Sequence, residues 1–467
     1  MNKKNLREEK DSIGKIMVPK DKYWGAQTQR SLMNFQIGSD LMPKEIIKAF
    51  AIQKKSAAIS NLALNNIEEK IGETILKVCD EIIEGKLFDH FPLSVWQTGS
   101  GTQTNMNLNE VIANRGNEIL GKEIGKNIPI HPNDHCNLGQ SSNDSFPTAM
   151  HIAIVIETNE RLIPVINRFE KTLKKKEQEY FKIVKIGRTH LQDAVPLTLG
   201  QELSAFKEQI RKCKIRINLA IKEILSISQG ATAVGTGLNT SKNFIMGFVK
   251  ALQEITSYPF ESGENKFESI SSHDSIVNFS GAICSLTTAC YKIANDIRLL
   301  ASGPRCGIGE LILPANEPGS SIMPGKVNPT QSEALTQVCI YLLGYNNSLS
   351  FAASQGHFQL NANKTLMAHV IIRSINLISD AIDSFEKNCL KGMKPNLEVI
   401  DENVKKSLML VTALNPKLGY DKSAKVAKKA FEENMTLKQA AVKLGYLSDS
   451  EFDDWVNPIN MTKTFNQ

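Results

Sequence analysis

At 467 residues the chain is long enough for about three domains of ordinary size and for a large core. Its 41% hydrophobic and 22% charged residues are the proportions of an ordinary soluble globular protein. The net charge of +6 comes from 55 basic and 49 acidic residues spread along the chain. No basic run exceeds residues 174–176, so a nucleic-acid surface is not indicated, whereas a mildly positive pocket for an anion is allowed.

The N-terminal stretch MNKKNLREEKDSIGKIMVPKDKYWG has no apolar region of the kind a secretory signal needs, and its acidic residues argue against a transit peptide. No window of the sequence is expected to span a membrane. We therefore expect a cytoplasmic protein with neither a membrane nor a nucleic acid as partner.

The chain order suggests three domains. Residues 1–140 mix short amphipathic stretches with segments rich in glycine, asparagine and threonine, which predicts a smaller N-terminal domain. Residues 141–394 contain three long stretches without proline and predict a central domain of helices 20 to 30 residues long. Residues 395–467 begin at Pro395 and carry short charged helices such as TLKQAAVKLGYL, which predicts a small helical C-terminal domain.

The central helices are predicted from apolar residues that recur at alternating steps of three and four. The fold class is therefore mainly all-α, with a bundle of long helices. These apolar seams are too long for one chain's few helices to cover, which points to association with further copies of the chain. A monomeric bundle with a large core is the alternative. The seams run through Leu203, Phe206, Ile210, Cys213, Ile217, Ala220 and Ile224; through Ile276, Phe279, Ile283, Leu286, Cys290, Ile293, Ile297 and Leu300; through Leu335, Val338, Leu342, Tyr345 and Leu349; and through Ile371, Ile375, Ile378, Ile382 and Phe385.

The cysteines are scattered, with no C-x-x-C pair and no cluster with histidine at the spacing of metal ligands. We expect most of them to be small buried side chains in a reducing compartment. No metal ion and no other cofactor is expected. The eight are Cys79, Cys136, Cys213, Cys284, Cys290, Cys306, Cys339 and Cys389.

Polar segments between the helices carry the chemistry. They are QTGSGTQTNMNLNEVIANR (97–115), HPNDHCNLGQSSND (131–144), KIGRTHLQDAVPLTLGQE (185–202) and PGSSIMPGKVNP (318–329). Glycines let a backbone approach a ligand closely, and clustered hydroxyls and amides are neutral donors suited to carboxylates. Each segment alone is a weak signal. Residues 140–144, for example, also fit a simple helix N-cap.

Together these segments resemble the ordered motif set of class II fumarases, within the aspartase/fumarase superfamily of lyases. The motifs that carry the resemblance are TGSGTQTNMNLNEV, HPND, GQSSNDSFPTAMH, GRTHLQDAVPLTLGQE and GSSIMPGKVNP, with SLMLVTALNPKLGYDKSAKVAKKA near the C-terminus. The resemblance implies a homotetramer whose core bundle combines helices of four subunits. It also implies active sites assembled from loops of three subunits, acting on fumarate and malate.

The expected reaction is the reversible hydration of fumarate to (S)-malate, by anti elimination through an aci-carboxylate intermediate. Removing water from a 2-hydroxy dicarboxylate needs a base for a weakly acidic C–H, donors for the dianionic intermediate and an acid for the leaving hydroxide. By resemblance the base is Ser320, whose alkoxide Lys326 and nearby N–H groups can stabilise. His190 is the candidate for the other proton, and the resemblance pairs it with Glu333. Whether Ser320 or a water held by His190 takes the carbon-bound proton stays open.

The remaining expected site residues follow from matching motif positions. Substrate carboxylates would be bound by Ser100, Gly101, Thr102, Ser141, Ser142, Asn143, Thr189, Ser321, Lys326, Val327 and Asn328. A second, non-catalytic anion site would be formed by His131, Pro132, Asn133 and Asp134, for which a plain β-turn is the alternative.

Two other functions remain in view at this point. A related lyase of the aspartase or argininosuccinate type is the first, but aspartases carry glutamine where this chain has His190. Ammonia leaves without an acid, whereas hydroxide leaves poorly without one, so His190 favours the hydratase. The second is a non-catalytic structural protein on the same scaffold, which the full set of candidate catalytic residues disfavours.

Overall fold

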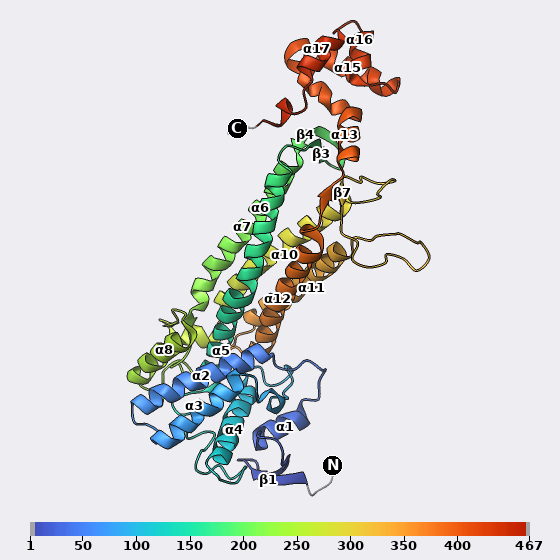
Figure 1. The fold of residues 1–467 in the computed structure, drawn as a ribbon. Helices are drawn as coiled ribbons and strands as arrows, with labels where there is room; N and C mark the ends of the chain where they lie inside the picture. The colour runs from blue at the N-terminus through green and yellow to red at the C-terminus, as the bar shows by residue number, and fades with distance from the viewer. Residues whose placement is uncertain (1–4, 464–467) are drawn as a thin grey trace. The chain divides into compact units, whose positions relative to one another are not determined.

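The protein is mainly helical in the computed structural model, which describes residues 5–463 (Figure 1). The predicted all-α class is therefore confirmed, with short two-stranded sheets added. Contacts along the chain define two compact units. Unit 1 comprises Met1–Pro164, Cys213–Thr287 and Ile340–Ser379, and unit 2 comprises Val165–Lys212, Thr288–Cys339 and Asp380–Gln467. The three consecutive domains expected from the sequence are a different partition and stay a prediction.

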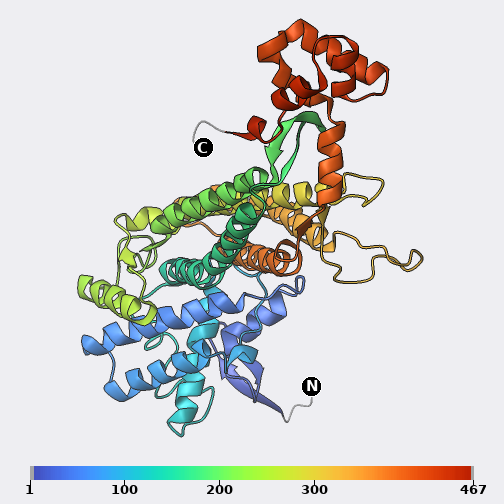
Figure 2. The same ribbon diagram turned by 45° about the horizontal axis from the view of Figure 1, so that its top comes forward.

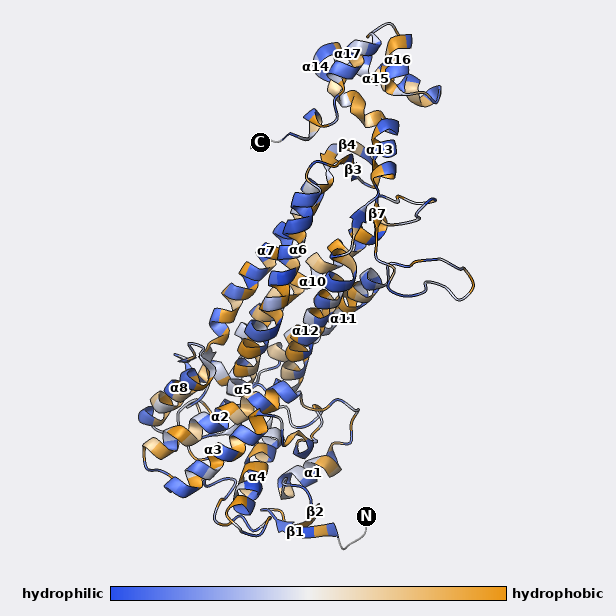
Figure 3. Ribbon diagram, viewed as in Figure 1, coloured by the Kyte–Doolittle hydropathy of each residue, from blue (hydrophilic) through white to orange (hydrophobic). Residues whose placement is uncertain are grey.

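Five long helices contribute residues to both units: α6 (Ile163–Glu179), α7 (Leu199–Ile224), α10 (Asp274–Leu300), α11 (Thr330–Ser354) and α12 (Lys364–Phe385). The apolar repeats predicted four of these, α7, α10, α11 and α12, and every predicted seam residue of α7, α10 and α12 is buried. No apolar repeat was identified for α6. On α11 Leu335, Leu342 and Leu349 are buried, whereas Val338 and Tyr345 are half-buried. Hydrophobic positions recur along these helices in Figure 3.

One expectation about these helices needs correction. The segment Lys364–Leu390 is long and apolar enough to cross a membrane by length and composition, although no such window was expected from the sequence. Of its most apolar window 67% is buried inside the protein, as is usual for the core helix of a folded domain. Its apolarity is therefore explained by packing.

Unit 1 is built around α2, which packs against α3, α5 and α8. Phe50 of α2 meets Phe146 of α5 edge to face, with ring centroids 5.8 Å apart. The elements of this unit are β1 (Leu6–Lys10), β2 (Lys15–Pro19), α1 (Ala26–Asn34), α2 (Lys44–Ala63), α3 (Glu69–Ile83), η2 (Phe88–His90), α4 (Thr102–Ile119), α5 (Ser142–Glu157), η3 (Thr158–Leu162), β5 (Ser226–Ile227), α8 (Lys242–Thr256), β6 (Glu261–Ser262) and α9 (Lys266–Ser271).

Unit 2 contains the hairpin of β3 (Val184–Thr189) and β4 (Gln192–Thr198), which contacts α13 (Leu397–Lys406) and η5 (Leu408–Leu414). Both views show the hairpin beside these C-terminal helices (Figure 1 and Figure 2). Ile186 of β3 joins a small core that includes Leu414 and Val426. The other elements of the unit are β7 (Leu311–Ile312), η4 (Glu386–Leu390), β8 (Lys394–Pro395), α14 (Asn415–Leu418), α15 (Tyr420–Glu432), α16 (Leu437–Lys443), α17 (Asp449–Trp455) and η6 (Asn460–Thr462).

Candidate active site

A chain of hydroxyl groups lies in unit 1, where α4 and α5 begin. Ser100 Oγ is 2.9 Å from Thr102 Oγ1, and Thr102 Oγ1 is 2.8 Å from Ser142 Oγ. Gly101 between them has φ of +79°, and a Cβ there would come within 2.0 Å of the Phe146 ring. Only glycine fits this position. The structure thus brings Ser100, Thr102 and Ser142 together, as their predicted common role requires.

The start of α5 confirms the N-cap interpretation of residues 140–144. Ser141 Oγ accepts a hydrogen bond from the Asn143 N–H at 3.2 Å, and the Asp144 carboxylate accepts one from the Ser141 N–H at 2.9 Å. This capping box satisfies N–H groups that a helix start leaves unpaired. The hydroxyl of Ser141 is therefore hydrogen-bonded to the backbone of α5, whereas the hydroxyl of Ser142 contacts that of Thr102. The Asn143 side chain donates to the carbonyl oxygen of Ala233 at 2.8 Å.

Two buried ionisable residues beside this cluster were missed by the sequence analysis. Asp144 is fully buried and also accepts hydrogen bonds from the N–H groups of Gly230 and Thr232, at 3.0 and 2.9 Å. Burial raises the pKa of Asp144 although these N–H groups act against it. Lys364 is also fully buried at the start of α12. Lysine and aspartate are usually exposed, so neither position carries a signal in the sequence alone.

His190 lies at the tip of the β3–β4 hairpin in unit 2. His190 and Leu191 form its two-residue turn, with φ of +56° and +61°, and both side chains are exposed. Positive φ at both turn positions suits a tight hairpin, but it is normally supplied by asparagine and glycine. A bulky leucine in this conformation is strained, and such strain is most often retained where a site needs it. Thr189, the other predicted site residue here, is also exposed.

Ion pairs with little exposure to solvent hold strand β3 of this hairpin. Arg188 donates to Glu310 at 2.8 Å, and the Lys185 ammonium lies 3.1 Å from the same carboxylate. Lys185 and Glu310 are fully buried. Burial raises the pKa of Glu310, but Arg188 and Lys185 together bring it below its ordinary value. The hairpin that carries His190 is therefore held by an ion-pair network two residues from the histidine.

The segment 318–329 forms a loop before α11 whose ends are tied together. The Gly319 N–H donates to the Lys326 carbonyl oxygen at 2.9 Å, and the Asn328 side chain donates to the Gly319 carbonyl oxygen at 2.6 Å. A Cβ on Gly319 would lie 2.3 Å from the Lys326 oxygen, so this closure needs glycine. The loop borders an open hollow of about 420 Å³ lined in part by Ser320 and Lys326.

Ser320 has a specific environment within this loop. Its Oγ accepts hydrogen bonds from the N–H groups of Ile322 and Met323, at 3.2 and 3.0 Å. Two N–H donors aimed at one hydroxyl oxygen favour its negatively charged form. Ser321, Lys326 and Val327 are exposed on the same loop. Glu333 is exposed in the first turn of α11, and the described part of the chain records no hydrogen bond or ion pair between it and His190.

The residues of the expected second anion site form the predicted turn. His131 Nδ1 accepts hydrogen bonds from the N–H groups of Asn133 and Asp134, at 3.2 and 3.1 Å. The turn interpretation is thus confirmed. Among residues 5–463 no hydrogen bond engages the Nε2 atom of His131, which can serve another partner. His131, Pro132 and Asn133 border a pocket of about 330 Å³.

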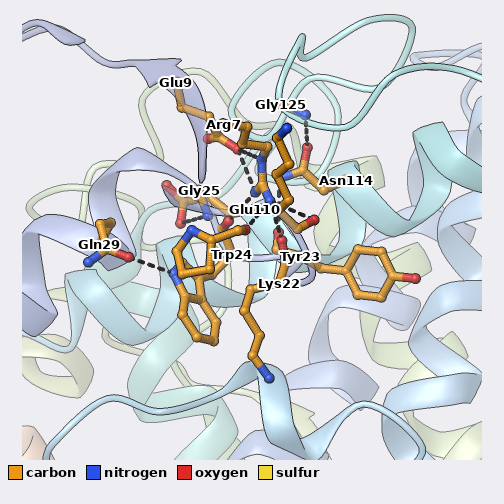
Figure 4. Close-up of polar contacts among 12 residues, drawn as sticks. Arg7, Glu9, Lys22, Tyr23, Trp24, Gly25, Gln29, Glu110, Asn114 and Gly125 are labelled. Carbon is orange, nitrogen blue, oxygen red and sulfur yellow. Dashed lines mark hydrogen bonds and ion pairs between the residues drawn. The ribbon is translucent and has the colours of Figure 1, made fainter. Parts of the chain in front are cut away.

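The same pocket is also lined by carboxylates, which already have ion-pair or hydrogen-bond partners. Glu9 pairs with Arg7, whose guanidinium also donates to the carbonyl oxygens of Lys22 and Trp24 (Figure 4). Glu110 accepts hydrogen bonds from the N–H groups at the start of α1, including that of Gly25 at 2.8 Å. Burial raises the pKa of Glu110 to about 7 despite these bonds. The negative charges are therefore offset by fixed donors.

Across residues 5–463 no group of three histidine, cysteine or acidic side chains is arranged to hold a metal ion. All eight cysteines are free, and six of them are buried, as expected from their scattered positions.

Comparisons with known proteins identify the family of this chain. Residues 14–344 match a family model described as lyase, and residues 410–463 match one described as fumarase C C-terminus. The chain is 54% identical to the mitochondrial fumarate hydratase of Rhizopus oryzae, over 98% of this chain and 92% of that protein. It is also 54% identical to a class II fumarate hydratase of Rickettsia felis, over 98% and 99% of the two chains.

A solved structure is similar over the same extent. The class II fumarase of Schistosoma mansoni matches 98% of this chain and 99% of its own, at 44% identity and a TM-score of 0.95. Identity at this level over nearly the full length of both chains assigns the family, as the motifs predicted. The chain belongs to the class II fumarate hydratase family of the lyases.

Proposed function

We propose that the protein catalyses the reversible hydration of fumarate to (S)-malate without a cofactor. The observation that carries this proposal is the environment of Ser320, whose hydroxyl oxygen accepts two backbone N–H groups in a loop that also carries Lys326. The family assignment supports the same reaction, since the relatives named above are fumarate hydratases.

In the direction of dehydration, Ser320 as alkoxide takes the proton from C3 of malate. The electron pair moves into the adjacent carboxylate and forms the aci-carboxylate dianion. The two N–H groups lower the cost of forming the alkoxide, and Lys326 on the same loop favours negative charge. Lys326 and Asn328 also bind the substrate carboxylate, together with the N–H of Val327 and the hydroxyl of Ser321.

His190 delivers a proton to the leaving hydroxide, which departs as water from the opposite face. Its exposed position at a strained turn suits a group that must reach a ligand rather than pack in a core. Glu333 orients the imidazole, and Thr189 donates to the substrate. The alternative is that a water held by His190 takes the carbon-bound proton, with Ser320 serving only as a binding hydroxyl.

The hydroxyl chain of unit 1 binds the other carboxylate. Ser100, Thr102 and Ser142 are neutral donors on a common surface, beside the starts of α4 and α5. Helix starts favour anions, because their N–H groups are unpaired and their dipoles are positive there. Gly101, Ser141 and Asn143 complete the site, with Gly101 allowing close approach. His131, Pro132, Asn133 and Asp134 form a second, non-catalytic anion site.

The active form is a homotetramer in which three subunits contribute loops to each site. Large apolar side chains on the long helices support this association. Leu219 of α7 is 58% exposed in the single chain, and Ile340 and Phe351 of α11 are 59% and 74% exposed. Exposed apolar area of this kind on a helix face marks an interface. Sedimentation of active enzyme at the monomer mass of 51.7 kDa would overturn both the tetramer and the shared site. We place the enzyme in the cytoplasm.

The test of the reaction is the absorbance of fumarate after malate is added to purified protein. With malate, we expect the absorbance to rise to a plateau. With fumarate as the starting material, the absorbance should fall until the same ratio of fumarate to malate is reached. A protein that leaves malate unchanged would favour the structural role, and one that consumes fumarate only with ammonium would favour an aspartase.

A further inference from the structure

Three helices of unit 1 begin next to one another. Thr102 begins α4, Ser142 begins α5 and Lys364 begins α12. Thr102 and Ser142 are joined by their hydroxyls, 2.8 Å apart. The Lys364 N–H donates to the carbonyl oxygen of Gly99 at 2.8 Å, and the virtual Cβ of Gly99 would lie 1.3 Å from the Ala362 oxygen. The start of α12 therefore lies directly against the segment that carries Ser100 and Thr102.

The ammonium group of Lys364 lies near these helix starts and has few hydrogen-bond partners. It is fully buried, and its ammonium has one recorded hydrogen bond, to the carbonyl oxygen of Asn143 at a long 3.4 Å. An ammonium group has three protons to donate. Two of them have no acceptor recorded in the described chain. A buried donor left in this state is costly unless a ligand or water completes it.

The charges around Lys364 also favour the binding of an anion. The starts of three helices present positive dipole ends, which disfavour an added cation. Burial lowers the pKa of Lys364, whereas the negative charge of Asp144 in α5 raises it. The Asp144 carboxylate already accepts hydrogen bonds from the N–H groups of Ser141, Gly230 and Thr232. His273, buried just before α10, faces Lys364 as a further titratable group, and Lys266 of α9 adds positive charge near Asp144.

We propose that Lys364 is an additional substrate-binding residue, whose ammonium pairs with the carboxylate held by Ser100, Thr102 and Ser142. This inference rests on the proposed function and deepens it. The hydroxyls of that cluster are neutral, whereas the substrate is a dianion. The buried cation of Lys364 beside the start of α5 supplies the charge that these half-buried hydroxyls lack.

The pairing predicts proton uptake on binding. Burial lowers the pKa of Lys364 to about 7, so in the free enzyme at pH 8 the amine is mostly neutral. A carboxylate bound beside it stabilises the ammonium and raises its pKa. Binding at pH 8 should therefore take up protons at Lys364, and binding at pH 6 should take up fewer. The same linkage makes the affinity fall as the pH rises from about 7 to 9.

The experiment is titration calorimetry of the whole enzyme with succinate, which resembles the substrate but cannot be hydrated. Titrations in buffers of different ionisation enthalpy give the protons taken up. In Lys364→Arg the guanidinium stays charged, so succinate should bind within a few-fold of the parent affinity with the Lys364 proton uptake removed. In Lys364→Met the affinity should fall at least tenfold, and the uptake at pH 8 should disappear.

Lys54 provides a matched control. It is also buried, and burial lowers its pKa to about 7, but its ammonium has two amide acceptors, Asn137 and Gln140, at 3.1 and 3.0 Å. Lys54→Met should keep the parent's proton uptake. Uptake that is equal in the parent and in Lys364→Arg would overturn the proposal, as would unchanged affinity in folded Lys364→Met.

If Lys364→Met does not fold, Lys364→Gln takes its place, because its amide is also uncharged. Unchanged succinate affinity in folded Lys364→Gln overturns the proposal. Because succinate binding needs no turnover, a protein that fails to hydrate fumarate but shows Lys364-dependent uptake would refute the proposed reaction and keep this inference.

Discussion

The hydroxyl of Thr102 lies 2.8 Å from the hydroxyl of Ser142, although 40 positions separate the two residues in the sequence. Each is the first residue of its helix, so one contact joins two helix starts. The contact brings together donors from two motifs that are separate in the sequence. It also distinguishes Ser142 from its neighbour Ser141, whose hydroxyl caps α5.

The first prediction follows from that difference. Ser142→Ala should raise KM for fumarate by roughly 5- to 100-fold, because one hydrogen bond to a charged carboxylate is lost. Ser141→Ala should lower the free energy of unfolding by about 1 kcal/mol, because it removes an N-cap. Steady-state kinetics and denaturant melts of both variants check this. Equal effects of the two changes on KM would contradict it.

The second prediction concerns the acid and the base. Ser320→Ala and His190→Asn should each lower kcat by roughly 10²- to 10⁴-fold while fold and assembly are kept, since both side chains lie outside the helical seams. The double variant should lose less than the product of the two factors, because both groups serve one reaction cycle. Ser320→Ala with near-parental turnover would move the base to a water held by His190.

The third prediction compares two glycines of the 318–329 loop. Gly319→Val should reduce turnover strongly, because a Cβ there meets the Lys326 carbonyl oxygen at 2.3 Å and opens the closed loop. Gly325→Val should reduce it less, since Gly325 has φ of +80° but open space around the added Cβ. Circular dichroism should show both variants folded. A larger defect in Gly325→Val would contradict the role given to the Gly319–Lys326 contact.

The fourth prediction concerns acid stability. His151 is buried and its Nδ1 bonds the carbonyl oxygen of Ile224 at 2.8 Å; burial lowers its pKa to about 4 from 6.5. As the pH falls, His151 is protonated in the unfolded chain before it is protonated in the folded one. The contribution of neutral His151 to the free energy of unfolding is therefore complete above pH 6.5 and is lost as the pH falls toward 4. The loss is about 3 kcal/mol.

Urea melts at pH 7 and pH 4.5 measure this loss. His151→Gln keeps an amide donor for the Ile224 oxygen but does not titrate, so its stability should fall less between the two pH values. A variant with the same acid loss as the parent would show that other groups cause it.

The fifth prediction is that activity does not depend on a metal. No cysteine or histidine cluster in the sequence has ligand spacing, and none forms in the described residues. Turnover after dialysis against EDTA should equal that of untreated enzyme. Loss of activity that iron or another divalent metal restores would contradict it.

The long helices were predictable because burial imposes a period that the sequence displays directly. Ile283 and Cys290 of α10, two turns apart, are both fully buried as their spacing requires. The motifs likewise identified Ser320 and His190 as candidates. Their local geometry was not predictable, since the two N–H groups on Ser320 depend on how the loop closes between Gly319 and Lys326.

Other features depend on contacts between distant segments. A buried lysine looks like an exposed one in the sequence, so Lys364 could be recognised only once α12 was seen to begin against Gly99. The turn at His190 and Leu191 contains neither glycine nor asparagine, so sequence rules for tight hairpins do not find it. At Lys364 tertiary packing overrides the local preference, whereas Leu191 is 70% exposed, so packing within the chain does not explain its turn.

The proposed hydration is tested most directly by equilibrating fumarate with the purified protein in D₂O and following the products by proton NMR. Anti addition predicts malate that carries a single deuterium at C3, as one diastereomer, because one group adds the proton while water adds to the opposite face. No malate, malate with deuterium in both orientations, or product that forms only when ammonium is added would contradict it.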